Sequence, residues 1–343
     1  MGVYTVLDDK KVDETVAADL KHIIERVTAR THIHSIILGG GFGRGEGSVL
    51  ISQGRIQAVN DYDLFVIISD DDKTDFRSME NNIVGEIGIR LLDLIPIKYF
   101  NLTTLPPTQF NYDLKYGGRH LWGENLIDLI PQYKEGYVDP ESGKTLLLNR
   151  LICAIEAYSE KFEQQCMTTE GKFFLVNQTG KVVSACVEAL LIKRGKYHHS
   201  YQERRDIFKA EFPQEKDLQK LNERATEFKL RPSTLIDFDA IEYWKKAIHE
   251  YGKVISEYFE LGSTQPGEKI WKALKRKILV TNQPIERVEL LLLLYLEASF
   301  FRRRRILKMA KKELKDIIKT SFQTTGWESL RERTACLWHE LYH

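Results

Sequence analysis

Two aspartates one residue apart, Asp61 and Asp63, open an apolar run that ends at Ile68. The run is typical of a β-strand, so both side chains fall on one face, because strand side chains alternate with a period of two. A third carboxylate, Asp93, lies inside another apolar run, 88–97, where it is costly unless paired, hydrogen bonded or bound to a metal. The alternative is an edge strand on which Asp93 faces water. Three such carboxylates are the ligands that Mg²⁺ prefers, and two divalent ions about 4 Å apart support phosphoryl transfer to a hydroxyl.

A glycine-rich segment precedes these aspartates. Residues 39–47 read GGGFGRGEG and follow a short apolar strand, 33–38. Glycines permit positive φ and let backbone N–H groups approach an anion closely. We therefore expect Gly40 and Gly41 to hold the β- and γ-phosphates of a nucleotide, with Arg44 taking a phosphate oxygen.

Two other phosphate motifs do not fit. The glycine-rich segment does not match the G-x-G-x-x-G spacing of dinucleotide-binding folds in any register, because position 44 is arginine and position 46 is glutamate. The sequence Gly143-Lys144-Thr145 imitates the end of a P-loop, but the first glycine of that motif is replaced by Val138.

The combination of glycine turn, Asp61-x-Asp63 and Asp93 resembles the DNA polymerase β-type nucleotidyltransferase superfamily. The run from Gly40 to Glu46 is similar to the G-G-Y-G-R-x-E of the protein-PII uridylyltransferase branch. The resemblance implies an α+β fold with a mixed sheet and flanking helices. It also implies two Mg²⁺ ions as cofactor, with Mn²⁺ as a substitute. The donor would be a nucleoside triphosphate, most often ATP, and the reaction would release pyrophosphate. The spacer before Asp61 is longer than usual, and we attribute this to a hairpin or loop insertion at 49–59.

The rest of the chain predicts a second domain that is entirely helical. A polar stretch, 132–143, separates it from the first, so we place a catalytic domain at 1–135 and a helical nucleotide- and acceptor-binding domain at 136–343. Apolar spacing predicts helices at 14–29 in the first domain and at 145–164, 177–193, 201–210, 218–230, 237–259, 288–320 and 327–341 in the second, with a break allowed within 288–320.

Two groups of helical residues bear on the partners. The resemblance implies a helical domain that covers the nucleotide, in which Lys181 could reach the triphosphate and Ser184, one turn on, could assist; a surface lysine on a core helix is the alternative. The segment Arg302–Lys315 is strongly basic and could bind RNA phosphates. The alternative, a solvated face balanced by Glu297, Glu313 and Asp316, is the one that we favour from the sequence.

Composition sets wider bounds. The chain has 343 residues and a formal net charge of +1, so nothing global indicates nucleic acid or membrane binding. Its four cysteines, Cys153, Cys166, Cys186 and Cys336, form no C-x-x-C pair and are expected to be reduced and mostly buried. The N-terminus lacks a secretory pattern, and the most apolar run, 288–301, is too short to span a bilayer. These features predict a cytoplasmic protein with no membrane partner.

The leading hypothesis is an enzyme that moves a nucleoside monophosphate to a hydroxyl of a small molecule, a protein or a second nucleotide. The alternatives are an RNA-binding terminal nucleotidyltransferase and an inactive nucleotide-binding module. The motif residues do not choose the acceptor.

Overall fold

The structure is a computed structural model that describes residues 2–52, 54–89, 91–163, 167–232, 238–259, 284–297, 300–318 and 326–342. Its contacts divide the chain into two compact units, both discontinuous in sequence. The first contains Met1–Asp139, Gly195–Ile207 and Thr226–Ile236, and the second contains Pro140–Arg194, Phe208–Ala225 and Asp237–His343. The boundary drawn from the sequence at residue 135 stays a prediction.

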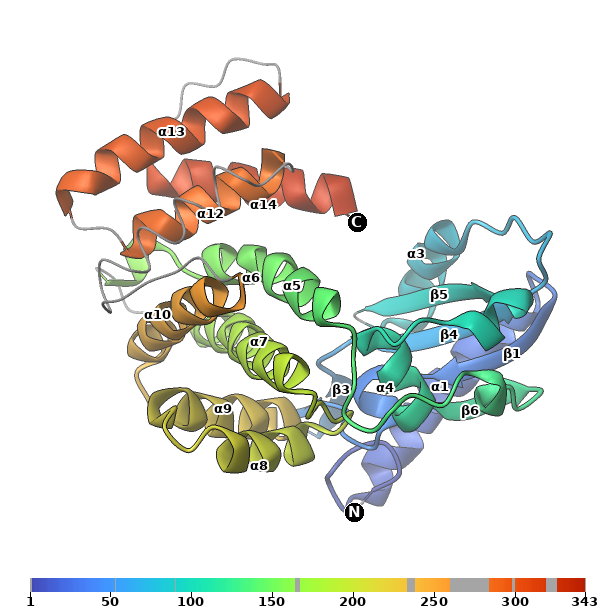
Figure 1. Ribbon diagram of the computed structural model, residues 1–343. Helices are drawn as coiled ribbons and strands as arrows, with labels where there is room; N and C mark the ends of the chain where they lie inside the picture. The colour runs from blue at the N-terminus through green and yellow to red at the C-terminus, as the bar shows by residue number, and fades with distance from the viewer. Residues whose placement is uncertain are drawn as a thin grey trace. The chain divides into compact units, whose positions relative to one another are not determined.

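The first unit is built on a small mixed sheet (Figure 1). Its strands are β1 (Ile33–Leu38), β4 (Tyr62–Ile68), β5 (Leu92–Lys98) and β6 (Arg119–Gly123), in the order β5-β4-β1-β6. β1 pairs antiparallel with β4 and β6, whereas β4 pairs parallel with β5. This sheet with flanking helices, and the helical region that follows in the chain, confirm the α+β prediction at this level.

Alternation along the strands gives the sheet two apolar faces. On one face, Ile36, Leu64 and Leu94 pack with α1 (Lys10–Thr28) and α3 (Phe76–Ile87). On the other face, Ile37 and Phe65 pack with residues of the 3-10 helices η1 (Tyr99–Thr104) and η2 (Ile127–Leu129) and of α4 (Gln109–Gly117). Because the strand period is two, every second residue belongs to the same face. The face that carries Phe65 is therefore also the face of Asp63.

Two predictions for the first unit can be compared with its local structure. The hairpin or loop expected at 49–59 is a hairpin of β2 (Val49–Ser52) and β3 (Arg55–Ala58), whereas its being an insertion stays a prediction. The strand expected at 88–97 begins later, at Leu92, because α3 extends to Ile87 and is capped by Gly88, which has φ +69°. No element was predicted for the residues of α3. The glycine turn contains one short helix, α2 (Gly40–Gly43), which the sequence did not predict.

The second unit is helical throughout its described part. Its helices begin with α5 (Pro140–Asn149), α6 (Leu151–Glu156), the 3-10 helix η3 (Glu160–Glu163) and α7 (Thr169–Arg194), and continue through α10 (Ala240–Tyr258), α12 (Pro284–Glu297), α13 (Phe300–Ile318) and α14 (Trp327–Tyr342). Two further helices, α8 (Tyr201–Glu211) and α9 (Lys216–Leu230), belong partly to each unit. The helix expected at 145–164 is replaced by α5, α6 and η3, and residue 164 lies outside the described part of the chain. The helix expected at 288–320, for which the sequence allows a break, is described as α12 and α13. Residues 319 and 320 lie outside the described part of the chain.

One helix has the length and composition of a membrane span. It is α7, whose most apolar window is 83% buried inside the structure. The core helix of a soluble protein passes the same test, so this is weak evidence, and the cytoplasmic location stays a prediction. Cys153 and Cys186 are buried free thiols, Cys336 is exposed, and Cys166 lies outside the described residues.

Candidate functional site

The three predicted carboxylates lie together. Asp61, Asp63 and Asp93 each offer an oxygen atom, and these atoms all lie within 4.8 Å of one another. Asp61 and Asp63 are partly buried, whereas Asp93 is exposed. Among the residues that the structure describes, this is the group with the composition and spacing for a metal ion.

The sheet explains why residues 30 positions apart meet. Asp63 and Asp93 are directly paired across the parallel strands β4 and β5. Asp61 precedes β4 by one residue and projects to the same side as Asp63. β5 is the edge of the sheet, which keeps Asp93 accessible to solvent. Asp93 therefore lies exposed on an edge strand and also belongs to the acidic cluster, and its role as a metal ligand stays a prediction.

The charge of the cluster favours a cation. Burial, followed by the charges of Asp61 and Asp93, raises the pKa of Asp63 to about 7. A carboxyl group with such a pKa is destabilised in its charged form, and a divalent ion with oxygen ligands would remove that penalty. The donor set of three carboxylates fits Mg²⁺ or Mn²⁺.

The glycine turn is packed directly against this cluster. The N–H of Gly39 donates to the backbone oxygen of Asp63 at 2.8 Å. Gly40 has φ +57°, and a Cβ placed there would come within 1.7 Å of Asp63 Oδ2. Within the described part of the chain, the N–H groups of Gly40 and Gly41 donate to no backbone oxygen. They are therefore able to bind an anion.

Replacing Gly40 with alanine is expected to disrupt the site. Alanine at this position would have to keep the left-handed backbone of Gly40, which costs roughly 1 kcal/mol. Its Cβ would also displace the Asp63 carboxylate. We expect the apparent affinity for Mn²⁺, measured by isothermal titration calorimetry, to fall at least about tenfold. Gly54, which has φ +77° and open space around it, is the control, because Gly54→Ala brings the backbone strain without the collision. Equal Mn²⁺ binding by both variants would contradict this expectation.

Arg44 is buried beside the glycine turn and is paired with two acids. Only 4% of its side chain is exposed, and it forms ion pairs with Glu46 (Nε to Oε2, 3.6 Å) and Asp113 (Nη1 to Oδ2, 3.2 Å). These two ion pairs give Arg44 a part in holding the glycine turn. Its assignment to a phosphate oxygen stays a prediction.

Glu46 links that turn to a distant segment. Its carboxylate accepts hydrogen bonds from Ser200 Oγ (2.8 Å) and from the N–H groups of Tyr201 (2.8 Å) and Gln202 (3.2 Å), at the start of α8. Burial alone would raise the pKa of Glu46, but the bonds from Tyr201 and Ser200 and the charge of Arg44 lower it below its ordinary value. Glu46 therefore caps α8 while it pairs with Arg44.

Lys229 is a candidate that sequence reasoning missed. It lies near the end of α9, in the part that belongs to the first unit, and its backbone oxygen accepts a hydrogen bond from Ser48 Oγ. Its Nζ lies 5.5 Å from the centre of the Tyr201 ring. Its charge partly offsets the rise in the pKa of Asp63 that burial and the neighbouring acids cause. No described carboxylate lies within ion-pairing distance of its ammonium group, so Lys229 is the cation available to a negatively charged ligand at the acidic cluster.

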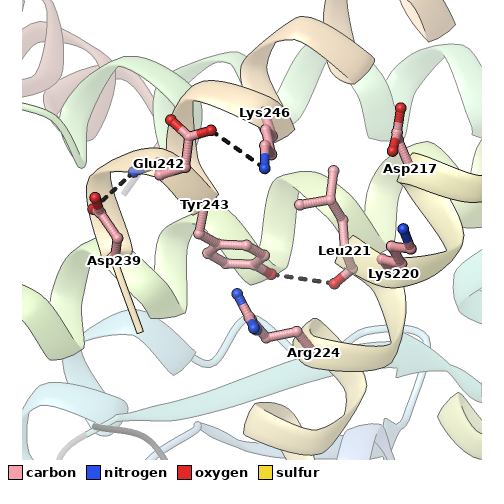
Figure 2. Close-up of a pocket in the computed structure, with 8 residues that line it drawn as sticks. All are labelled: Asp217, Lys220, Leu221, Arg224, Asp239, Glu242, Tyr243 and Lys246. Carbon is pink, nitrogen blue, oxygen red and sulfur yellow. Dashed lines mark hydrogen bonds and ion pairs between the residues drawn. The ribbon is translucent and has the colours of Figure 1, made fainter. Parts of the chain in front are cut away.

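Lys181 and Ser184 lie on α7 in the second unit, where both are partly buried. That unit has a pocket of about 300 Å³ between α9 and α10 (Figure 2). Its lining is charged on both helices, and the Glu242–Lys246 pair and Tyr243 mark the α10 side. Neither Lys181 nor Ser184 lines it, so their assignment to the nucleotide stays a prediction.

Comparisons of the chain with models of protein families, with curated proteins and with solved structures find no match.

Proposed function

We propose that the chain is a metal-dependent nucleotidyltransferase, which moves a nucleoside monophosphate from a nucleoside triphosphate to a hydroxyl group. The observation that carries the proposal is the acidic cluster, whose oxygens lie within 4.8 Å beside a glycine turn with unengaged N–H groups. The fold that we propose for the first unit is accordingly the nucleotidyltransferase type, on the resemblance of its motifs.

Each part of the site has a stated role. Asp61, Asp63 and Asp93 would hold Mg²⁺, which supplies Lewis-acid activation and charge neutralisation when bound. Gly40 and Gly41 would donate their N–H groups to the triphosphate. Asp93, the exposed carboxylate, would accept the proton of the attacking hydroxyl, because it is the one that an acceptor can reach from solvent.

The reaction balances without a further reactant. The acceptor oxygen forms a bond to the α-phosphorus, and the bond from that phosphorus to the oxygen bridging to the β-phosphorus breaks. Pyrophosphate carries away the electron pair of the broken bond. Lys229 would neutralise charge on the triphosphate, since its ammonium group acts on Asp63 and has no described acid as partner.

Replacing Lys229 with glutamine is expected to weaken nucleotide binding. Loss of one charge-assisted hydrogen bond costs about 1.5–3 kcal/mol, which corresponds to roughly a 10- to 150-fold rise in Kd. The Kd is measured by titrating the protein into a fluorescent ATP analogue in the presence of Mg²⁺. Lys181→Gln in the same titration tests the residue chosen from the sequence. A Lys229→Gln Kd equal to that of the parent would remove Lys229 from the site.

The function itself is tested by pyrophosphate release. The purified chain is incubated with each labelled triphosphate, Mg²⁺ and fractions of a metabolite or lysate pool. We expect release that EDTA abolishes and that the Asp61→Ala/Asp63→Ala variant lacks. If the parent binds nucleotide but releases no pyrophosphate in any mixture, the chain is a nucleotide-binding module and the enzyme proposal fails.

A further inference from the structure

One side of α13 is a continuous basic surface. Five cations, which we call the basic face, are exposed on it: Arg304, Arg305, Lys308, Lys312 and Lys315. At 3.6 residues per turn they fall within an arc of about 100°, and at 1.5 Å per residue they extend over about 17 Å. Nothing of the Arg302 side chain is described.

Of the acids that the sequence offered as balance, Glu313 and Asp316 do not pair with this face among the described residues, and the Glu297 side chain lies outside the described part of the chain. The helix carries eight basic residues and two acidic ones, a formal charge of +6, whereas the whole chain has only +1. Glu313 is engaged elsewhere, because Arg287 of α12 donates to its Oε1 at 2.7 Å. Among the described residues, no ion pair joins Asp316 or any other acid to the basic face.

The arginines also lie where they disfavour the helix. Arg304 and Arg305 are in the first turn and a half of α13, and the positive end of a helix dipole is destabilised by nearby cations. Their charge is therefore not explained by the stability of the helix. A helix start that carries arginines is instead a strong local attractor for anions.

The remaining side of α13 is committed to the core. Ile306, Ala310 and Leu314 are buried, and α13 packs extensively on α12. A helix that binds a membrane surface inserts its apolar side into the lipid, and here that side is not free. The exposed side of α13 therefore recognises a partner through the charge of its regularly spaced cations.

We propose that the basic face of α13 binds the phosphate backbone of a polynucleotide. One strand of a duplex carries a phosphate every 3.4 Å, so about five phosphates span the 17 Å that the five cations cover. Arginine and lysine are the residues that contact phosphate oxygens in such complexes. The basic face belongs to the second unit and the acidic cluster to the first, and the inference does not rest on the proposed function.

Binding of labelled 20-nucleotide RNA, single-stranded and duplex, to the full chain tests this inference by fluorescence anisotropy across a salt series. Five phosphate contacts predict a slope of log K against log[salt] of about −3.5 for a single strand. The triple variant Arg304→Gln/Lys308→Gln/Lys312→Gln is expected to reduce the slope to about −1.4. Its affinity at 0.1 M salt should fall roughly 100-fold.

Lys10, Lys11 and Lys21, exposed on α1, provide the matched control. Their triple replacement by glutamine removes the same net charge and should leave the slope unchanged. Far-UV circular dichroism checks that both variants fold, and Lys312→Gln alone should lower the slope by about 0.7. No RNA binding by the parent at 50 mM salt, or equal loss in both triple variants, would overturn the inference. Binding to vesicles with 30% phosphatidylserine but not to RNA would also overturn it, in favour of a membrane.

Discussion

Replacing Asp63 with asparagine is expected to raise the melting temperature of the metal-free protein and to abolish its stabilisation by Mg²⁺ or Mn²⁺. Three carboxylates with oxygens within 4.8 Å repel one another, and burial with this repulsion raises the pKa of Asp63 to about 7. Asparagine has the same shape without the charge, so it relieves the repulsion. The same change removes a ligand from between the other two carboxylates, and a hard cation then loses its site.

The size of the effect follows from ligand linkage. A ligand at 100 times its Kd stabilises the native state by about 2.7 kcal/mol. For a chain of this length that corresponds to a shift of roughly 4 °C in melting temperature. We expect this shift in the parent and a shift near zero in Asp63→Asn, both by differential scanning fluorimetry. Transfer activity should fall on the order of 10³-fold, as for loss of a principal electrostatic group.

Asp71→Asn is the matched control, because Asp71 is an exposed aspartate in the loop that follows β4. It should leave both the metal-free melting temperature and the metal-induced shift at parent values. A normal metal shift in Asp63→Asn would remove Asp63 from the metal site. A metal-free melting temperature below that of the parent would show that the three carboxylates do not repel as their spacing implies.

The acidic cluster could be predicted because each of its carboxylates is marked by the residues next to it in the sequence. A period of two puts Asp61 and Asp63 on one strand face, and an isolated carboxylate in the next apolar strand is conspicuous. The sequence could not give the parallel register that sets Asp63 opposite Asp93, since it depends on β4 and β5 being neighbours in the sheet. The helices were also accessible, because long apolar periodicities dominate local preferences.

The residues that were missed depend on contacts between distant parts of the chain. The ion pair of Arg44 could not be predicted, because its partner Asp113 is 69 residues away. Lys229 is ordinary in sequence and gains its importance only because α9 ends beside Asp63 and Tyr201. The helical pattern of α3 is hard to recognise in the sequence, because Asn81, Asn82 and Gly85 are poor helix formers. Packing of the buried side of α3 in the core offsets the cost of these residues.

The connection of Glu46 to α8 shows how such distant contacts hold the site. Replacing Glu46 with alanine is expected to destabilise the protein by about 3 kcal/mol. The change leaves Arg44 buried with one acid fewer, and it leaves Ser200 Oγ and the N–H groups of Tyr201 and Gln202 without their acceptor. Glu46→Gln keeps one acceptor oxygen and should cost about half as much. Urea unfolding followed by circular dichroism measures both.

Glu86→Gln is the matched control for that measurement. Glu86 also holds two arginines, Arg26 at 3.0 Å and Arg30 at 2.9 Å, but about a third of its side chain is exposed. Exposed ion pairs contribute little, so this change should cost less than about 1 kcal/mol. Equal losses for Glu46→Gln and Glu86→Gln would show that burial does not strengthen the Glu46 network.

The pH dependence identifies the charge of Glu46 as the stabilising element. Its pKa is lower in the folded state than in the unfolded chain, so its contribution is present above the unfolded pKa and is lost as the pH falls through the folded pKa. Glutamine does not titrate. The stability gap between the parent and Glu46→Gln should therefore be largest near pH 7 and narrow steadily below pH 4.5. A gap that stays constant down to pH 3 would mean that Glu46 acts through its shape and hydrogen bonds, without a contribution from its charge.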